Sequence, residues 1–288
     1  MSLFSGWSYR AKHEGAARDG AARLSRRLAL GLLVAAALTS SFAVKTKAAD
    51  SELQRVLAPS GKLRAGLYTG TPTSYLPSQS GEPKGVGYEL GKALAQRLGV
   101  PYEPVVFPKN ADVLDAVKTG KADVAFTNAS AARAKEMDFA QPYLQIELGY
   151  LVPQGSKVSS IDTVDTKGNR IGVTLGSSSE GELSRDLHNA ELVRAATFPI
   201  AVDMLKKGQI DAFATNKATL FELSDKIPGS KVLDGHWGYE RHAIAIPKGR
   251  DAGREFVRAF TADVMSNGLV AAAMERAGLR GAQVATTK

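Results

Sequence analysis

The sequence contains no cysteine and only four histidines. Without thiols the chain cannot form a disulfide, a thiolate metal site, a cysteine nucleophile or a lipid-modified cysteine behind an export signal. The histidines lack the spacing of a metal-binding motif, and the serines at 177–179 lack the GxSxG context of a hydrolase. We therefore expect no metal, no cofactor and no enzymatic activity.

The chain also has little charge of either sign in excess once its first segment is set aside. Residues 1–49 hold eight Lys or Arg and two acids, which accounts for six of the eight net positive charges and leaves only +2 on residues 50–288. Aromatic residues make up 7% and are scattered. A surface for nucleic acid needs clustered cations or stacking aromatics, so no nucleic-acid partner is expected.

Long apolar runs are absent apart from one stretch near the amino terminus. A basic segment ends at Arg26-Arg27, an uncharged run continues from Leu28 to Val44, and small residues follow. This layout is typical of a secretory signal, so we expect a cleavable signal peptide at 1–49 and a periplasmic protein. The run is short for a stable membrane span, although an uncleaved anchor is the alternative. The route of export, Sec or twin-arginine, stays open.

A repeat is the strongest internal signal. The segment from Asp115 to Asn128 is echoed 88 positions later by the segment from Asp203 to Asn216, with six of fourteen positions identical. Each copy predicts an amphipathic helix, a glycine where the helix stops, and a short apolar strand ending in Thr-Asn. Ligands bind at the carboxyl ends of strands in open α/β sheets. Two similar lobes facing a shared cleft are therefore expected, unless the similarity is chance.

Strands alternate with helices along the chain, which favours parallel sheets covered by helices. A helix is predicted at Tyr88–Leu98, and another is expected to start beside Ser179, which forms a capping-box pattern with Glu182. His242–Ile246 predicts a returning strand. Two terminal helices are expected on either side of Gly268.

Arg133 is the leading candidate for ligand binding. It follows the first Thr127-Asn128 strand end, and Ser130 is a good cap for a helix starting there. A guanidinium beside a helix amino terminus is suited to one carboxylate. The Gly-Ser loop at Gly176–Ser179 offers a second anion-friendly terminus. The plainer interpretations are an exposed helical arginine and a simple helix cap.

Most of the chain, from about Leu63 to Ala277, resembles the family 3 solute-binding proteins of bacterial ABC importers. The segments that carry the resemblance are Gly87–Gly99, Val117–Asp123, Ser130–Arg133, Met137–Tyr143, Ile171–Ser177 and Ala245–Gly249. The resemblance implies an α/β fold of two Rossmann-like lobes joined by two crossing hinge segments, which is the type II periplasmic-binding-protein fold. It implies that residues 50–144 and 243–288 form the first lobe and residues 145–242 the second.

The resemblance also assigns roles within the cleft. It implies that Arg133 holds the carboxylate of the ligand and that Ser130 assists it, while the loop containing Ser177 and Ser178 donates backbone N–H groups. The strand ends add three candidate ligand-binding residues of their own, namely Thr127, Asn128 and Asn216.

Departures from the family pattern concern the ligand. Asn216 stands where the family usually has an aspartate that pairs with an ammonium group, and Asn110 stands at a usual aromatic position. A second aromatic is missing near Thr73, although Tyr68 could compensate. Since asparagine supplies no charge, we expect a hydrophilic carboxylate that need not carry an α-ammonium group.

The function expected from the sequence is capture of a small carboxylate-bearing solute, an amino acid or a related compound, and its delivery to the membrane permease of an ABC importer. The protein is expected to be a monomer. The alternatives are a sensing or enzyme-maturation role on the same fold, or an enzyme similar to cyclohexadienyl dehydratase, which needs a general acid in the cleft.

Overall fold

The computed structural model describes residues 51–286, so the predicted signal peptide at 1–49 lies outside the described residues. The chain divides into two compact units, Met1–Glu52 and Leu53–Lys288, and the second is the subject below. None of the helices among residues 51–286 combines the length and the apolar character that a membrane crossing requires.

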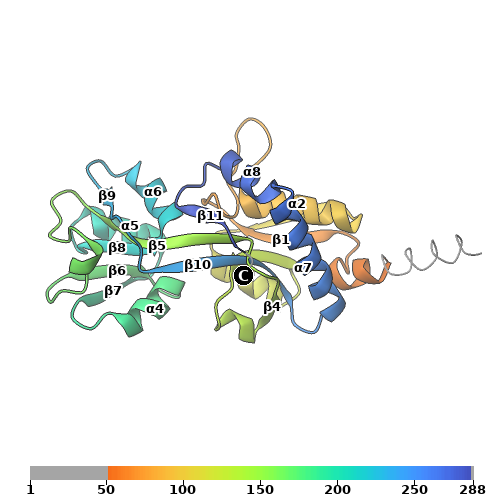
Figure 1. Ribbon diagram of the computed structural model, residues 1–288, viewed down its shortest axis with the longest axis horizontal. Helices are drawn as coiled ribbons and strands as arrows, with labels where there is room; N and C mark the ends of the chain where they lie inside the picture. Colours follow the sequence, from red (N-terminus) through yellow and green to blue (C-terminus); the bar gives the residue numbers. More distant parts are fainter. Residues whose placement is uncertain (1–50, 287–288) are drawn as a thin grey trace, which may run out of the picture. The chain divides into compact units, whose positions relative to one another are not determined.

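The second unit alternates strands and helices as expected, and Figure 1 shows their arrangement. The elements before the long strand β5 are β1 (Leu63–Tyr68), α2 (Val86–Leu98), β2 (Tyr102–Phe107), α3 (Asn110–Lys118), β3 (Val124–Asn128), η1 (Arg133–Lys135) and β4 (Met137–Phe139). The next are β5 (Leu144–Val152), η2 (Ile161–Thr163), β6 (Arg170–Thr174), α4 (Ser178–Asp186), β7 (Glu191–Ala195), α5 (Phe198–Lys206), β8 (Ala212–Asn216), α6 (Lys217–Ser224) and β9 (Lys231–Val232). The last are β10 (Gly238–Pro247), α7 (Asp251–Ser266), α8 (Leu269–Arg276) and β11 (Ala282–Val284).

The sheet is built from two equivalent halves. Its main strand order is β2-β1-β3-β10-β5-β8-β6-β7. Strands β1, β2 and β3 are parallel, as are β6, β7 and β8, whereas β10 runs antiparallel to β3 and β5 runs antiparallel to β8. The two parallel triplets are thus joined by an antiparallel ribbon of β5 and β10, which Figure 1 shows crossing the middle of the unit. The ribbon supplies the two crossing segments of the expected fold.

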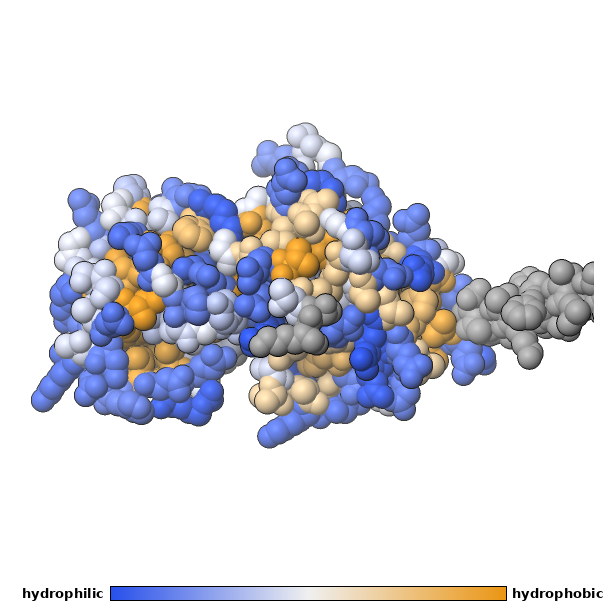
Figure 2. Space-filling model, in the orientation of Figure 1, coloured by the Kyte–Doolittle hydropathy of each residue, from blue (hydrophilic) through white to orange (hydrophobic). Residues whose placement is uncertain are grey.

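Each half has its own apolar core. In the first half, one cluster contains Leu67, Leu90, Phe126 and Phe260, and a smaller cluster contains Val113 and Val117. In the second half, one cluster contains Ile171 and Val173, and another contains Leu205, Phe213 and Leu220. Figure 2 shows hydrophilic residues interspersed with hydrophobic ones over the visible face. Each core lies between the strands of its half and the helices packed on them. The strand ends are thus left free to carry polar groups.

The sequence repeat is confirmed as a repeat of structure. In the first copy α3 is followed by Gly120, with φ of 72°, and then by β3. In the second copy α5 is followed by Gly208, with φ of 64°, and then by β8. Both glycines adopt the left-handed conformation, which a residue with a Cβ enters only at a cost. Both strands end on the asparagine of their copy.

The repeated aspartate, in contrast, serves the framework. Asp123 accepts hydrogen bonds from the backbone N–H of Arg64 at 3.0 Å and from its Nε and Nη2 at 3.0 and 2.7 Å. Asp211 accepts the same three bonds from Arg170, at 2.8, 3.1 and 3.0 Å. We call each arrangement an Asp-Arg clamp. Each clamp connects the start of one strand, β1 or β6, to the residue just before the strand that pairs with it, β3 or β8.

Replacing Asp123 by asparagine is expected to lower the free energy of unfolding by about 2 kcal/mol, because hydrogen bonds to a charged group contribute about 1.5–3 kcal/mol. The Asp123 side chain is fully buried, while its partner Arg64 is 21% exposed and can recover some hydration. Chemical denaturation would measure the change. Asp115→Asn is the matched control on the same repeat, because that side chain is 73% exposed. Equal effects of the two substitutions would contradict a special role for the clamp.

Two local expectations are wrong. The segment after Ser130 forms a single 3₁₀ turn, η1, instead of an α-helix, so Arg133 gains no sizeable helix dipole. Helix α4 is capped by Ser177, whose Oγ accepts a hydrogen bond from the Glu180 N–H at 3.1 Å, and not by Ser179. Ser179 instead lies buried within the first turn.

Candidate functional site

Arg133 lies in η1, directly after the end of β3. Its Nη1 donates to the Thr127 hydroxyl at 2.9 Å and to the Asn128 carbonyl at 3.1 Å. Among residues 51–286 no hydrogen bond or ion pair engages Nε or Nη2 of this half-buried guanidinium. Burial lowers the pKa of Arg133, while the charges of Glu240 and Tyr68 act to raise it. The fork is thus held on one side and free on the other, as a carboxylate site requires.

The residues around Arg133 hold one another in place. The Thr127 hydroxyl also accepts from Asn110 Nδ2 at 3.0 Å and donates to Asn110 Oδ1 at 3.2 Å. The Tyr68 hydroxyl lies 3.3 Å from that of Thr73. Burial raises the pKa of Tyr68, the charge of Glu240 also raises it, and the charge of Arg133 acts to lower it. The structure therefore brings these three predicted residues, Thr127, Asn110 and Tyr68, together around the guanidinium.

The ribbon of β5 and β10 supplies the base of the candidate site. Residues directly opposite each other in paired strands share a face, and faces alternate along a strand. His242 lies opposite Asn128, and Leu148 lies opposite both Asn216 and Gly238. Both strand-end asparagines therefore lie on the same face of the ribbon as Gly238, Glu240 and His242. The four-residue step from Gly238 to His242 spans about 13 Å, the scale of a small solute.

Glu240 lies midway along this face and is the charged group that the sequence analysis missed. Its Oε2 accepts from Asn216 Nδ2 at 3.1 Å and lies 3.3 Å from His242 Nε2, and its side chain is only 12% exposed. Burial acts to raise the pKa of Glu240, but His242, Arg133 and Asn216 together bring it below its ordinary value. A buried carboxylate that stays ionised and interacts with Arg133 marks this face as a charged site.

The two strand-end asparagines are already engaged by the protein. Asn128 donates from Nδ2 to the Ser178 hydroxyl at 3.0 Å and accepts at Oδ1 from the Arg241 N–H at 2.9 Å. Asn216 donates to Glu240 and accepts at Oδ1 from the Thr219 N–H at 3.0 Å, which caps α6. The Asn128 bond joins the end of β3 to the first turn of α4. Ser178 therefore faces Asn128 directly.

Ser177 and Ser130, which were both predicted to contact the ligand, also make contacts within the protein. The Ser177 N–H donates to the Thr174 carbonyl at 3.1 Å, so it is not available for a ligand in this conformation, and its hydroxyl caps α4. Ser130 accepts from the Arg133 N–H at 3.3 Å. The contact fixes the turn in which Arg133 sits. Both contacts position other site residues, the ligand contacts of Ser177 and Ser130 stay predictions, and Ser178 is the residue of α4 that meets Asn128.

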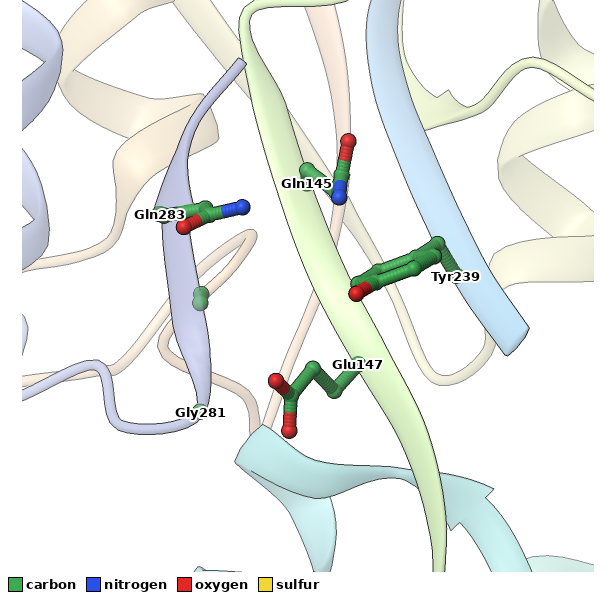
Figure 3. A pocket seen from close by; sticks show the side chains of 6 residues that line it. Gln145, Glu147, Tyr239, Gly281 and Gln283 are labelled. Carbon is green, nitrogen blue, oxygen red and sulfur yellow. The ribbon is translucent and has the colours of Figure 1, made fainter. Parts of the chain in front are cut away.

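A shallow pocket lies on the other face of the ribbon. Figure 3 shows it beside β5, β10 and β11, with Gln145, Tyr239 and Gln283 around it. Glu147 points toward this segment and forms an ion pair with Lys217 at 2.7 Å. Because Tyr239 and Glu147 alternate with Glu240 and Leu148 along their strands, this pocket is separate from the face that carries Glu240.

The signal that could have revealed Glu240 is its place in an apolar strand. Strand β10 begins at Gly238, four residues before the predicted start, so Glu240, Arg241 and His242 all precede the apolar run to Ile246 within one strand. Because successive side chains of a strand point to opposite faces, Glu240 and His242 lie on one face and Arg241 on the other. Because the returning strand was expected to begin only at His242, Glu240 lay outside it and was not considered as a site residue.

Comparison with known proteins gives consistent relatives. The L-cystine-binding protein TcyJ of Escherichia coli (strain K12) is 26% identical over 259 residues, covering 88% of this chain and 96% of that protein. The ABC transporter glutamine-binding protein GlnH of Bacillus subtilis (strain 168) is 24% identical, covering 82% of this chain and 88% of that protein.

Solved structures agree with the fold. The amino acid ABC transporter substrate-binding protein AbpA from Streptococcus pneumoniae, bound to L-arginine, gives a TM-score of 0.66 at 24% identity and covers 77% of this chain and 97% of its own. An ancestral arginine-binding protein bound to glutamine gives 0.63 at 27% identity, covering 75% and 97%. The family model of the bacterial extracellular solute-binding proteins, family 3, matches residues 63–278. The chain belongs to this family.

Proposed function

We propose that the protein is the periplasmic binding component of an ABC importer and that its ligand is a small amino acid held between Arg133 and Glu240. The relatives that are named for what they bind take amino acids or cystine, and those named for their system belong to ABC transporters. The predicted signal peptide supports a periplasmic location. On this proposal the protein captures its ligand and releases it to a membrane permease without changing it.

The observation that carries this proposal is a pair of opposite charges on one face. The guanidinium of Arg133 is free on one side, and the carboxylate of Glu240 lies within its electrostatic reach. An amino acid at neutral pH carries a carboxylate and an ammonium group, so it matches both. Each charge-assisted hydrogen bond in such a site contributes about 1.5–3 kcal/mol when water is excluded.

This proposal revises the ligand expected from the sequence. A solute without an ammonium group was expected because Asn216 supplies no charge and because two usual aromatic residues are missing. Glu240 accepts a hydrogen bond from Asn216 and places a full negative charge next to it. The acid that the family usually carries at the strand end therefore has a substitute on β10, and an α-ammonium group becomes part of the proposed ligand.

Glu240 also bears on the enzyme alternative, which requires a general acid in the cleft. A general acid must be protonated near the working pH. Since the pKa of Glu240 lies below its ordinary value, the residue is ionised at neutral pH and is poorly suited to donate a proton. This argues against Glu240 as the general acid of a dehydratase reaction. Turnover of prephenate or arogenate by the purified protein would support the enzyme instead.

Closure of two lobes would complete the site. We propose the first lobe at residues 50–144 and 243–288 and the second at 145–242, with the ribbon of β5 and β10 as the hinge. The bond from Asn128 to Ser178 joins a strand end of the first lobe to a helix of the second. A ligand that contacts both sides favours the closed state, because it gains contacts only there.

Isothermal titration calorimetry against single L-amino acids tests the proposal. We expect at least one to bind with a dissociation constant of micromolar or below, about −8 kcal/mol or more favourable. Its deaminated analogue, the corresponding 2-hydroxy acid, should bind at least tenfold more weakly because it offers nothing cationic to Glu240. Equal binding of the two would remove the ammonium from the proposal, and absence of any amino-acid binding would refute it.

A further inference from the structure

A second carboxylate lies beside the candidate site on helix α4. Glu182 follows Ser178 by four residues, so both lie on one face of the helix, and Ser178 is the residue that meets Asn128. A Cβ added at Gly238 would lie 3.6 Å from Glu182 Oε2. Gly238 and Glu240 share one face of β10, so Glu182 reaches the same face from the opposite wall.

The Glu182 carboxylate is only partly compensated by the protein. Within residues 51–286 it forms no hydrogen bond and no ion pair. The nearest cation on its helix, Arg185, donates instead to the Gly181 carbonyl. Burial raises the pKa of Glu182, the charges of Glu240 and Asp186 raise it further, and the charge of Arg185 offsets only part of this. The Glu182 carboxylate is therefore partly desolvated and faces the negative charge of Glu240. A cation placed between these two carboxylates would be stabilised.

Other polar groups beside the site are also without partners. The Tyr143 hydroxyl is fully buried, has no hydrogen-bond partner among the described residues and interacts electrostatically with Tyr68. Nδ1 of His242 likewise has no hydrogen-bond partner among the described residues, and the His242 side chain is 3% exposed. Buried polar atoms are nearly always paired, so unpaired ones beside a charged face point to a polar ligand.

The charges on this face do not balance. Arg133 and Arg185 supply two permanent positive charges, Glu240, Glu182 and Asp186 supply three negative charges, and His242 adds a cation only when protonated. The α-carboxylate and α-ammonium of an amino acid would match Arg133 and Glu240 and leave one negative charge in excess beside Glu182.

We infer that the ligand is an amino acid with a basic side chain, whose cationic end lies against Glu182. This inference rests on the proposed function and names the ligand class for the same site. Glu182 is then a specificity-determining residue: it selects the side chain, while Arg133 and Glu240 select the α-groups.

The inference is tested with two pairs of ligands that differ in one charge. L-Arginine and L-citrulline have nearly the same shape, and L-lysine and L-norleucine have similar side-chain lengths. Only the first member of each pair has a cationic side chain. Titration calorimetry on the exported protein should give at least tenfold tighter binding of the cationic member. In Glu182→Gln this ratio should fall below about threefold. Asp186→Asn, an exposed acid one turn along the same helix, should keep the wild-type ratio.

The outcomes separate the two proposals. If the wild-type protein binds neutral amino acids as tightly as basic ones, or if Glu182→Gln leaves the charge preference unchanged, the inference is overturned while the proposed function stands. An equal loss in Asp186→Asn would also overturn it, because the effect would then come from net charge alone. If no amino acid binds at all, both proposals fail. Thermal unfolding of each unliganded variant checks that the fold is retained.

Discussion

Replacing Arg133 by alanine is expected to weaken amino-acid binding about a hundredfold or more. The guanidinium is fixed by Thr127 and by the Asn128 carbonyl, so its free edge is oriented before the ligand arrives. Two charge-assisted hydrogen bonds together contribute about 3–6 kcal/mol, and water that enters the space left by the side chain would offset part of this loss. Arg133→Lys should fall between the two, because an ammonium keeps the charge without the planar fork.

Calorimetric affinity for the best ligand of the wild-type protein is the measurement. Lys135→Ala is the matched control, since Lys135 lies in the same 3₁₀ turn and is exposed. The control should bind as the wild type does. An unchanged dissociation constant for Arg133→Ala would remove this residue from the site and with it the carboxylate half of the proposal.

Replacing Glu240 by glutamine is expected to weaken binding of amino acids by about ten- to a hundredfold and to leave their 2-hydroxy analogues nearly unaffected. Glutamine keeps the size and can still accept the hydrogen bond from Asn216, but it cannot neutralise an ammonium group that has lost its water. Glu240→Asp keeps the charge on a shorter side chain and should retain more affinity than Glu240→Gln. Glu222→Gln is the matched control, because it removes the charge of a more exposed carboxylate on α6.

The same residue sets a pH dependence. Because the pKa of Glu240 is lowered in the folded protein, its charge is fully present above the ordinary glutamate pKa, about 4.3, and is lost as the pH falls through the lower folded value. The contribution of Glu240 to affinity should therefore stay constant from pH 7.5 to pH 5 and decline only in stronger acid. A loss of this contribution between pH 7 and 5 would show that Glu240 takes up a proton there and would contradict the assignment.

Much of the fold follows from local sequence pattern. The repeat around Gly120 and Gly208 predicted two equivalent halves, because a helix, a left-handed glycine and a short apolar strand are all specified within fourteen residues. Arg133, Thr127 and Asn128 were found for the same reason: each lies at or just after a predicted strand end. Such features depend on neighbours in the chain, and the structure brings these residues together.

The rest depended on pairing between distant segments. Glu240 belongs to the site because Gly238 lies opposite Leu148 and His242 lies opposite Asn128, and this register involves residues about 90 and about 110 positions away. A shift by one residue would turn Glu240 to the other face. The availability of the Ser177 N–H likewise depends on the turn geometry. Sequence pattern also does not distinguish the single turn η1 from a helix start, since Ser130 suits both.

The Asp-Arg clamps and the candidate site occupy opposite ends of the same strands. Asp123 and Asp211 come just before β3 and β8, whereas Asn128 and Asn216 end them, so about 16 Å separates framework from function in each half. Substitutions at the two ends of these strands should therefore have nearly additive effects on the free energy of unfolding. Such a layout lets ligand preference drift over evolutionary time without eroding the foundation, which makes the protein a good starting scaffold for engineered sensors of new solutes.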